Sequence, residues 1–217
     1  MQFETSVGTR DIEIHDVYVA GWTGRDRAAV DHHIAELAAI GVSPPSQVPL
    51  YYRVSADLLT QTSTIQVLGT DTSGEIEPLV IRSEGEIWLG LASDHTDRAL
   101  ETVSVAASKQ ICHKPVSSGL WRMAEVEDRL DDLILTCEIK ESNAWVTYQS
   151  GTLASIRPLS DLIAGIALQD GQAMLCGTLA AVGGVRPAAD YRMSLTDPKQ
   201  TRRLSLDYAV TALPSIT

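Results

Sequence analysis

The pattern of apolar and polar positions predicts many short strands and few helices. Strand-like runs, rich in β-branched and other apolar residues, are separated by turns of Gly, Ser, Thr and Asp. Residues 133–139 and 144–148 predict a hairpin around residues 141–143. The other runs cover residues 11–21, 48–54, 65–68, 75–81, 86–91, 173–176, 191–195 and 203–210.

Three further segments favour helix. Residues 26–40 carry apolar residues at helical spacing and predict a helix that ends at Gly41, because Pro44-Pro45 prevents it from continuing. Residues 96–109 predict a second helix or a turn, and residues 158–166 a third helix. Since the helices come singly and not after every strand, we expect a β-rich α+β protein and not a doubly wound parallel sheet.

The composition is that of an ordinary globular protein, with 217 residues of which 44% are hydrophobic and 21% charged. We expect one catalytic domain over residues 1–217, with an N-terminal strand segment at 1–20 and a core at 21–212. The net charge of −11 repels phosphate groups. We therefore expect no nucleic-acid partner and no docking on anionic membranes.

The sequence shows no recognisable targeting signal and no disulfide pattern, so we expect a cytoplasmic protein. The N-terminal residues have neither a basic n-region nor an apolar h-region, so we expect no signal peptide. Apolar stretches such as 162–168 are too short to span a bilayer. Cys112, Cys137 and Cys176 are odd in number and widely spaced, so we expect buried thiols and not disulfides or a zinc motif.

Two segments carry carboxylates that could bind a metal ion. Glu75 and Glu77 lie two apart in a strand-like run, which puts both on one face about 7 Å apart, and such hard oxygen ligands suit Mg²⁺ or Mn²⁺. Glu84 and Glu86 form a competing pair, and a solvated strand face explains either pair equally well. Asp94 follows an apolar strand and could be a third ligand or a helix cap.

A candidate general base lies on the first helix. His33 and Glu36 are three residues apart and share a helical face, where the carboxylate would raise the basicity of the imidazole. Asp31 and His32 are the alternative pair. A polar helix face with weak contacts is the other interpretation of this segment.

Candidate anion-binding residues are more scattered. Arg53, Arg98 and Lys109 could each bind a substrate carboxylate or stabilise an enolate, and each could equally be a surface charge. Gly177-Thr178 ends a strand, where its N–H and hydroxyl could contact an anionic substrate or form a simple turn.

In this order, the motifs resemble the fumarylacetoacetate hydrolase superfamily over about residues 20–210, especially its small acylpyruvase and oxaloacetate-decarboxylase branch and a bacterial subfamily without assigned function. The matching segments are His33-x-x-Glu36 (the His–Glu dyad), Val48–Ser55 (with Arg53 where the family usually has Lys), Gly74-Glu-Ile-Glu77 (the E-x-E metal strand), Asp94-His-Thr-Asp-Arg98 (the D-x-[ST]-x-R motif), Ser108-Lys109, and a C-terminal run with Gly151-Thr152, Cys176-Gly-Thr178 and Val182-Gly183.

The resemblance implies a mixed β-sandwich roll with a few peripheral helices and a homodimer. It implies Mg²⁺ or Mn²⁺ on Glu75, Glu77 and Asp94, with a small anionic 2-oxo acid as substrate. His33, Glu36 and Lys109 would be catalytic. The substrate-binding residues implied are Arg53, Ser55, Arg98 and Thr178.

Arg53 is one departure from the family pattern, and the region before Lys109, which lacks the usual Pro-Trp-type lid sequence, is another. The sequence departs from the pattern in three further places. The stretch between Glu77 and Asp94 is shorter than usual, which leaves Glu86 as an alternative third ligand. Pro78 predicts an edge strand or a bulge. Leu179 replaces the proline of the usual G-T-P sequence.

Three functions follow from the resemblance. The first is hydrolysis of a C–C bond in an acylpyruvate or β-diketo acid, with His33 activating water. The second is decarboxylation of oxaloacetate, or hydration or dehydration of a 2-keto-3-deoxy sugar acid, on the same metal site. The third is binding of a dicarboxylate without catalysis.

Overall fold

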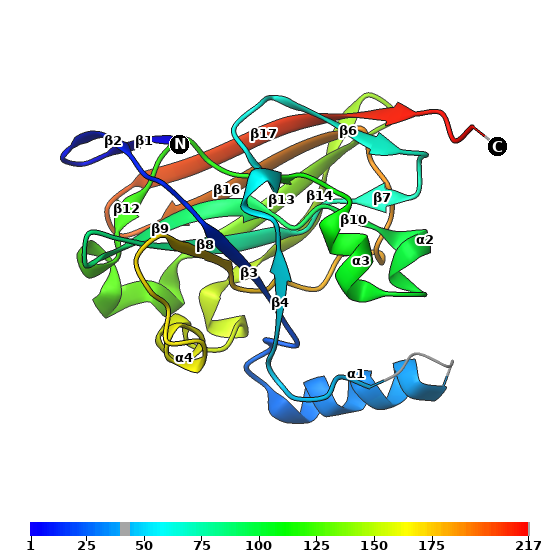
Figure 1. Ribbon diagram of the computed structural model, residues 1–217, viewed down its shortest axis with the longest axis horizontal. Coiled ribbons are helices and arrows are strands. Elements are labelled where there is room, and N and C mark those ends of the chain that lie inside the picture. Colours follow the sequence, from blue (N-terminus) through cyan, green and yellow to red (C-terminus); the bar gives the residue numbers. More distant parts are fainter. Residues whose placement is uncertain (40–43, 217) are drawn as a thin grey trace.

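The computed structural model describes residues 1–39 and 44–216, apart from the side chains of His33, Glu36, Leu37 and Ala39. Two sheets dominate it (Figure 1). The first has six strands in the order β12 (Trp121–Arg122), β9 (Glu86–Ser93), β8 (Ile76–Ser83), β15 (Gln172–Leu175), β3 (Asp16–Gly21) and β4 (Leu50–Val54). The second has five strands in the order β14 (Ala144–Thr152), β13 (Ile134–Glu141), β16 (Asp190–Asp197), β17 (Arg202–Leu213) and β6 (Thr64–Leu68).

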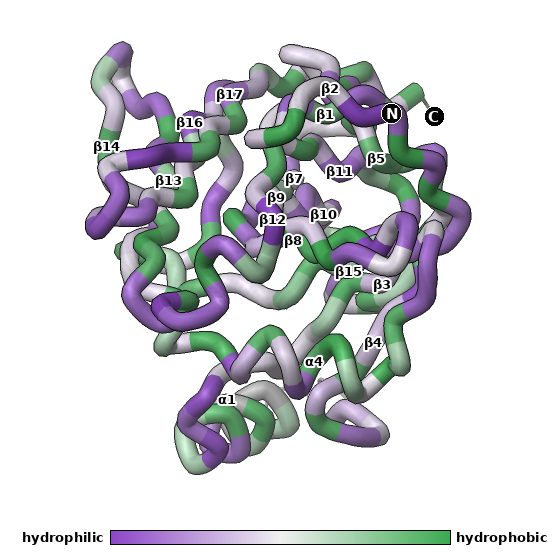
Figure 2. Tube along the Cα trace, turned by 90° about the vertical axis from the view of Figure 1, so that its left-hand side faces the viewer, coloured by the Kyte–Doolittle hydropathy of each residue, from purple (hydrophilic) through white to green (hydrophobic). Residues whose placement is uncertain are grey.

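Short strand pairs and helices surround these sheets. The pairs are β1 (Gln2–Thr5) with β2 (Gly8–Asp11), β7 (Thr72–Ser73) with β10 (Thr96–Asp97), and β5 (Leu59–Thr60) with β11 (Lys114–Pro115). The α-helices are α1 (Arg27–Ala39), α2 (Arg98–Glu101), α3 (Val105–Gln110) and α4 (Leu159–Gly165). Short 3-10 segments lie at Ala56–Leu58, Met123–Glu125, Glu127–Asp132 and Leu153–Ser155. Both α1 and α4 lie at one end of the molecule, below the strands (Figures 1 and 2).

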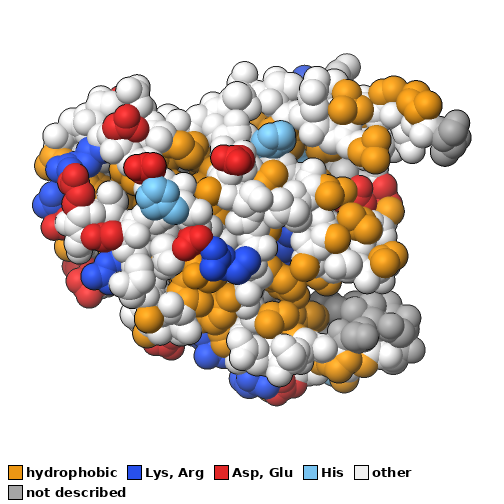
Figure 3. Space-filling view, in the orientation of Figure 1, with side chains coloured by type: hydrophobic (Ala, Val, Ile, Leu, Met, Phe, Trp, Pro, Cys, Tyr) orange, Lys and Arg blue, Asp and Glu red, His pale blue; other side chains and the backbone are white. Residues whose placement is uncertain are grey.

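Most neighbouring strands run antiparallel, while β3 with β15, β6 with β17, and β5 with β11 are parallel. The chain therefore has the expected β-rich α+β architecture. Its few helices do not alternate with the strands, as they would in a doubly wound sheet. The surface is uneven in character. In Figure 3, hydrophobic side chains gather on the right, where α2 and α3 lie in Figure 1.

Strand β8 is buried on both of its faces. Ile76 and Val80 pack in the cluster that includes residues of both sheets, and Leu79 and Ile81 pack in a second cluster with β3 and the N-terminal segment. This double burial explains why residues 78–81 form a continuous apolar run and not an alternating one. The Glu75-x-Glu77 motif thus leads into a segment that is buried on both faces.

Most predicted elements are confirmed, with corrections at their ends. The strand predicted from residue 11 begins at Asp16, and residues 2–11 form the β1–β2 hairpin. The predicted helix or turn over 96–109 contains two short helices, α2 and α3. The predicted end of the first helix at Gly41 lies outside the described residues.

The expectation that Pro78 marks an edge strand is wrong. Strand β8 has a neighbour on each side, β9 and β15. Pairing with β15 runs only as far as Leu79, so the proline lies just past the end of that ladder, where its missing N–H interrupts no pair. Its carbonyl still accepts a hydrogen bond from the Cys176 N–H at 3.0 Å.

Two smaller expectations can also be checked. The three cysteines are free thiols, and all are buried, as predicted. Among the described residues, no helix combines the length and the apolar character needed to cross a membrane.

Because Leu79 is completely buried on β8, we expect Leu79→Ala to lower the free energy of unfolding by about 2–5 kcal/mol. The matched control is Leu68→Ala, since Leu68 is 56% exposed and its truncation should cost less than about 0.5 kcal/mol. Urea unfolding of the two variants measures both values. Equal losses would contradict the assignment of β8 to the core.

Candidate active site

The β8–β9 hairpin brings the predicted metal ligands to one end of the first sheet. The two strands pair in register from Ser83↔Glu86 at the turn to Ile76↔Ser93 at the far end. Asp94 follows directly, and its N–H donates to the Glu75 carbonyl at 2.9 Å. The short stretch between Glu77 and Asp94 is therefore a tight hairpin, and the hairpin is what places Asp94 beside the Glu75-x-Glu77 strand.

These carboxylates line a cavity of about 730 Å³. Its charged lining includes Glu75, Glu77, Asp94, Arg98 and Lys109. Its less polar lining comes from the β3 end, α1, β4 and later loops, and includes Trp22, Ala29, Val30, Tyr52, Val105 and Val185. The cavity combines a cluster of charges with apolar walls, the usual character of a small-molecule site.

Asp94 is completely buried and paired with two lysines. Its Oδ2 accepts a hydrogen bond from the Lys109 ammonium, and its Oδ1 lies 3.1 Å from Lys114 Nζ. Burial alone would raise the pKa of Asp94, but the two ammonium groups outweigh it and hold the pKa well below the usual value. Asp94 is therefore a carboxylate anion in the folded protein.

Lys109 and Lys114 respond to this pairing differently. Burial works against the charge of both, yet Asp94 and Glu75 raise the pKa of Lys109 above its ordinary value. The pKa of Lys114 is lowered, because its burial outweighs its attraction to Asp94 and Lys109 repels it. The two lysines are not equivalent, although both contact the same carboxylate.

Glu77 is held by a backbone N–H from another strand end. The Gly177 N–H donates to Glu77 Oε2 at 2.7 Å. Gly177 has φ +94°, and a Cβ there would lie 1.6 Å from Thr23 Oγ1, so only glycine fits. Burial raises the pKa of Glu77 well above its usual value, and the nearby charge of Asp94 raises it further.

Glu75 is held by Arg98, from α2. Arg98 lies 3.3 Å from Glu75 Oε2 and 2.8 Å from Glu101 Oε2, and its Nε donates to Ser73 Oγ at 2.6 Å. Burial raises the pKa of Glu75, while Arg98 opposes the rise. Arg98 therefore lines the cavity as expected, but its donors already serve Glu75, Glu101 and Ser73.

A buried polar network supports the segment around Asp94. His95 Nδ1 lies 3.0 Å from Tyr208 Oη, and His95 Nε2 lies 2.9 Å from Thr72 Oγ1. Tyr208 also lies 2.8 Å from Ser93 Oγ. Because Tyr208 belongs to β17, the network ties the end of the hairpin to the second sheet.

Of the remaining predicted substrate-binding residues, one lines the cavity and two do not. Thr178 lines the cavity, but its hydroxyl donates to the Ile76 carbonyl at 2.7 Å and so fixes the start of β8. Arg53 is exposed, stacks on the Tyr18 ring at 4.6 Å and pairs with Asp16. Ser55 is exposed and hydrogen-bonds Gln110. The structure thus places Arg53 and Ser55 outside the cavity lining, because β4 turns their side chains toward solvent.

The alternative carboxylate pair is at the wrong end of the hairpin. Glu86 pairs with Ser83 beside the turn and lies 3.5 Å from Arg122, and Glu84 pairs with Arg10 at 2.8 Å. The idea that Glu86 is the third ligand is therefore wrong.

The side chains of His33 and Glu36 lie outside the described residues. Asp31, of the alternative pair, is bound to Arg27 on the helix surface at 2.8 Å.

Sequence reasoning missed two groups of site residues. Lys114 contacts Asp94 directly, but a lysine before a proline carries no signal of a buried ion pair. Trp22 and Tyr52 form part of the cavity wall. The φ of +60° at Trp22 is costly for a bulky residue and common at functional sites, but a sequence does not display it.

Glu75, Glu77 and Asp94 are chemically the type of ligand that a divalent cation prefers. All three face one cavity, and hard oxygen donors are what Mg²⁺ and Mn²⁺ prefer. Within the described part of the chain, however, no three His, Cys, Asp or Glu side chains are arranged as a formed metal site. Lys109 contacts Asp94 and Arg98 contacts Glu75, so internal cations already pair with two of the three carboxylates.

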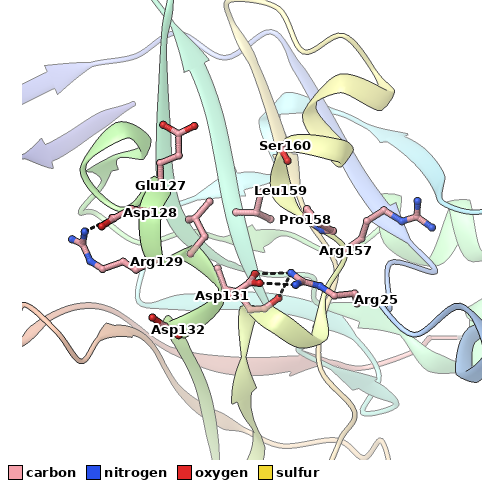
Figure 4. Close-up of a pocket in the computed structure, with 12 residues that line it drawn as sticks. Arg25, Glu127, Asp128, Arg129, Asp131, Asp132, Arg157, Pro158, Leu159 and Ser160 are labelled. Atoms are coloured by element: carbon pink, nitrogen blue, oxygen red, sulfur yellow. Dashed lines mark hydrogen bonds and ion pairs between the residues drawn. The ribbon is translucent and has the colours of Figure 1, made fainter.

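A second, smaller cavity of about 350 Å³ lies next to the first and shares Arg25 with it. Figure 4 shows Arg25 and Asp131 pointing toward each other, joined by two hydrogen bonds of 2.6 Å. Arg129 donates a single hydrogen bond to Asp128 at 2.7 Å. Because Asp131 holds the Arg25 guanidinium, this residue is not an available substrate cation in the larger cavity.

Comparison with known proteins gives a family. A family model described as "Protein of unknown function (DUF2848)" matches residues 20–208. The chain belongs to the DUF2848 family. No curated protein matches this DUF2848 chain significantly.

Solved structures share the fold of this DUF2848 protein at low sequence identity. One, titled "Crystal structure of Cg1458 with inhibitor", has a TM-score of 0.69 and 14% identity over 95% of this chain and 81% of the other. A 2-keto-3-deoxy-D-arabinonate dehydratase complexed with magnesium and 2,5-dioxopentanoate has a TM-score of 0.68 and 14% identity over 96% and 78%.

A third solved structure, a maleylpyruvate hydrolase from Sphingobium sp. SYK-6, has a TM-score of 0.57 and 14% identity over 90% of this chain and 71% of the other. At such identity these likenesses establish the fold alone.

The burial of His95 predicts a pH effect on stability. Burial, with the nearby charge of Lys114, lowers the pKa of His95 to about 3. Below about pH 6.5, His95 is therefore protonated in the unfolded chain but stays neutral in the folded chain. The free energy of unfolding falls as the pH drops from there toward 3, by up to about 1.4 kcal/mol per pH unit.

The measurement is urea unfolding of the wild type and His95→Gln at several pH values between 7 and 4. The raised pKa values of Glu75 and Glu77 act in the opposite direction in both proteins, so the difference between the two proteins isolates His95. Parallel pH profiles would contradict the prediction.

Proposed function

We propose that the protein is a divalent-metal-dependent enzyme that hydrolyses a C–C bond in an acylpyruvate or related β-diketo acid. The observation that carries the proposal is the placement of Glu75, Glu77 and Asp94 together with Lys109 in one cavity. The shared fold with a magnesium-bound dehydratase and a maleylpyruvate hydrolase supports it.

Glu75, Glu77 and Asp94 would hold Mg²⁺ or Mn²⁺. When bound, the cation supplies Lewis acidity that favours an enolate of a 2-oxo acid. Arg98 and the Gly177 N–H orient Glu75 and Glu77 from behind. Lys109 lines the cavity and its ammonium contacts Asp94; it would bind the substrate carboxylate or the enolate oxygen.

The cavity walls favour a substrate with an apolar acyl group. Trp22, Tyr52, Val105 and Val185 form part of the cavity wall. A 2-oxo acid head on the charged side would leave its acyl tail against these side chains. Burial of apolar surface would then contribute to binding in proportion to tail length.

The proposed base is His33, oriented by Glu36, acting on a water molecule. This role follows from the family resemblance. It is supported by the position of α1, whose Ala29 and Val30 line the cavity. The homodimer and the cytoplasmic location implied by the sequence remain part of the same proposal.

Dehydration of a 2-keto-3-deoxy sugar acid, or decarboxylation of oxaloacetate, is the second candidate. The TM-score is higher with the dehydratase, 0.68, than with the hydrolase, 0.57. The same carboxylates and Lys109 would stabilise the same kind of enolate, but no water would attack a carbonyl. Binding of a dicarboxylate without turnover is the third outcome.

We expect Mg²⁺- or Mn²⁺-dependent turnover of one member of a panel of acylpyruvates, oxaloacetate and 2-keto-3-deoxy sugar acids. Glu77→Gln should lower kcat/KM by at least about 100-fold, since even partners of metal ligands cost 10–100-fold. Glu86→Gln is the control, because it changes the same residue type at the other end of the hairpin. Loss of activity in both variants would contradict the assignment, and metal-free dicarboxylate binding without turnover would favour the third outcome.

Hydrolysis can be distinguished from decarboxylation or dehydration by whether oxygen from the solvent enters the product. Hydrolysis in ¹⁸O-water places label in a newly formed carboxylate, whereas decarboxylation or dehydration does not. If the reaction is hydrolysis, His33→Ala should lower kcat by about 10²–10⁴-fold, with little loss of substrate affinity. An unlabelled product together with an active His33→Ala variant would replace hydrolysis by the second candidate.

A further inference from the structure

The two oxygens of Asp94 are both occupied by cations of the chain itself. Lys109 holds Oδ2, and Lys114 lies 3.1 Å from Oδ1. Asp94 is completely buried, and it is one of the residues that line the cavity. A divalent cation that binds Asp94 from this cavity would therefore lie beside a lysine ammonium and meet its like charge.

Lys114 is the fixed lysine. It is completely buried and is absent from the cavity lining. Besides contacting Asp94, its ammonium donates to the carbonyls of His95 and Lys109, each at 2.6 Å. All of its donors thus serve groups of the chain, and its departure would leave two buried carbonyls without partners.

Lys109 is placed to move. It lines the cavity, and within the described residues its ammonium has one hydrogen-bond acceptor, Asp94 Oδ2. The ring of Tyr52, another wall residue, lies 5.8 Å from Lys109 Nζ and offers a cation–π site on the way out. The lysine stem is flexible, so the ammonium can turn into the cavity while its backbone stays in α3.

The charge balance favours exchange over addition. Glu75, Glu77, Asp94 and Glu101 face Lys109, Lys114 and Arg98, so internal cations already compensate most of the carboxylate charge. A divalent cation added beside an unmoved Lys109 would meet a like charge in contact with its own ligand. Movement of Lys109 off Asp94 removes that repulsion and frees Oδ2.

We propose that Lys109 is an exchangeable internal cation. Its ammonium neutralises Asp94 Oδ2 until a divalent cation binds there, and it then swings into the cavity to meet the anionic substrate, while Lys114 keeps Oδ1. This inference rests on the proposed metal-dependent function. It adds that metal binding and exposure of the substrate-binding lysine are one coupled event.

The first measurement needs no variant. The wild-type protein is treated with a trace amine-reactive reagent with and without saturating Mn²⁺, and labelling of each lysine is read by peptide mass spectrometry. We expect labelling of Lys109 to rise several-fold with Mn²⁺, while Lys114 stays protected. Unchanged or reduced labelling of Lys109 at saturation overturns the exchange.

The second measurement is Mn²⁺ affinity by calorimetry. Lys109→Met removes the competitor and should bind Mn²⁺ about tenfold tighter or more than the wild type, whereas Asp94→Asn should bind far more weakly. Lys140→Met is the control for general loss of positive charge, because Lys140 is exposed on β13. A folded Lys109→Met variant that binds no tighter than this control overturns the exchange.

The two hypotheses fail in different ways. In one case the wild type binds Mn²⁺ and Asp94→Asn does not, but Mn²⁺ does not increase the labelling of Lys109 and Lys109→Met binds Mn²⁺ no tighter than the wild type. The metal site then stands and the exchange is wrong. If the wild type binds no Mn²⁺ at all, the metal-dependent function is itself wrong, and the exchange falls with it.

Discussion

The pairing of buried Asp94 with two lysines is the interaction on which the site depends. Burial of a carboxylate away from solvent costs free energy unless nearby cations and hydrogen bonds compensate its charge. Here the compensation comes from Lys109 on α3 and Lys114 on β11, while Asp94 itself ends the β8–β9 hairpin. One charge requirement thus links side chains from three elements at the charged side of the cavity.

The second sheet supports this charged side from behind. Gln149 of β14 accepts from the Ile76 N–H at 2.9 Å and donates to Thr178 at 2.8 Å, and Tyr208 of β17 contacts His95. Polar groups buried between sheets are costly unless paired, and these are paired with the ends of the strands that carry the carboxylates. The core therefore positions the chemistry as well as stabilising the fold.

The sequence predicted that Glu75 and Glu77 share one face of a strand and misjudged some of their surroundings. Strand periodicity, a local property, placed the pair together, and the order of motifs along the chain favoured them as metal ligands. Arg53 was expected in the site, but it faces solvent beside Asp16 and Tyr18, because the orientation of β4 is set by its pairing with β3. Glu86 remained a rival of Asp94 only until the hairpin register separated them.

By itself, the sequence determined the kind of protein: strand-rich elements, single helices, an acidic surface, buried thiols and an ordered series of carboxylate and basic motifs. These follow from local spacing and composition. Only the tertiary structure decided that Lys114 shares Asp94 and that the donors of Arg98 serve Glu75, Glu101 and Ser73. Such pairings join residues far apart in the chain, and burial in a common cavity, which no local pattern records, gives them their strength.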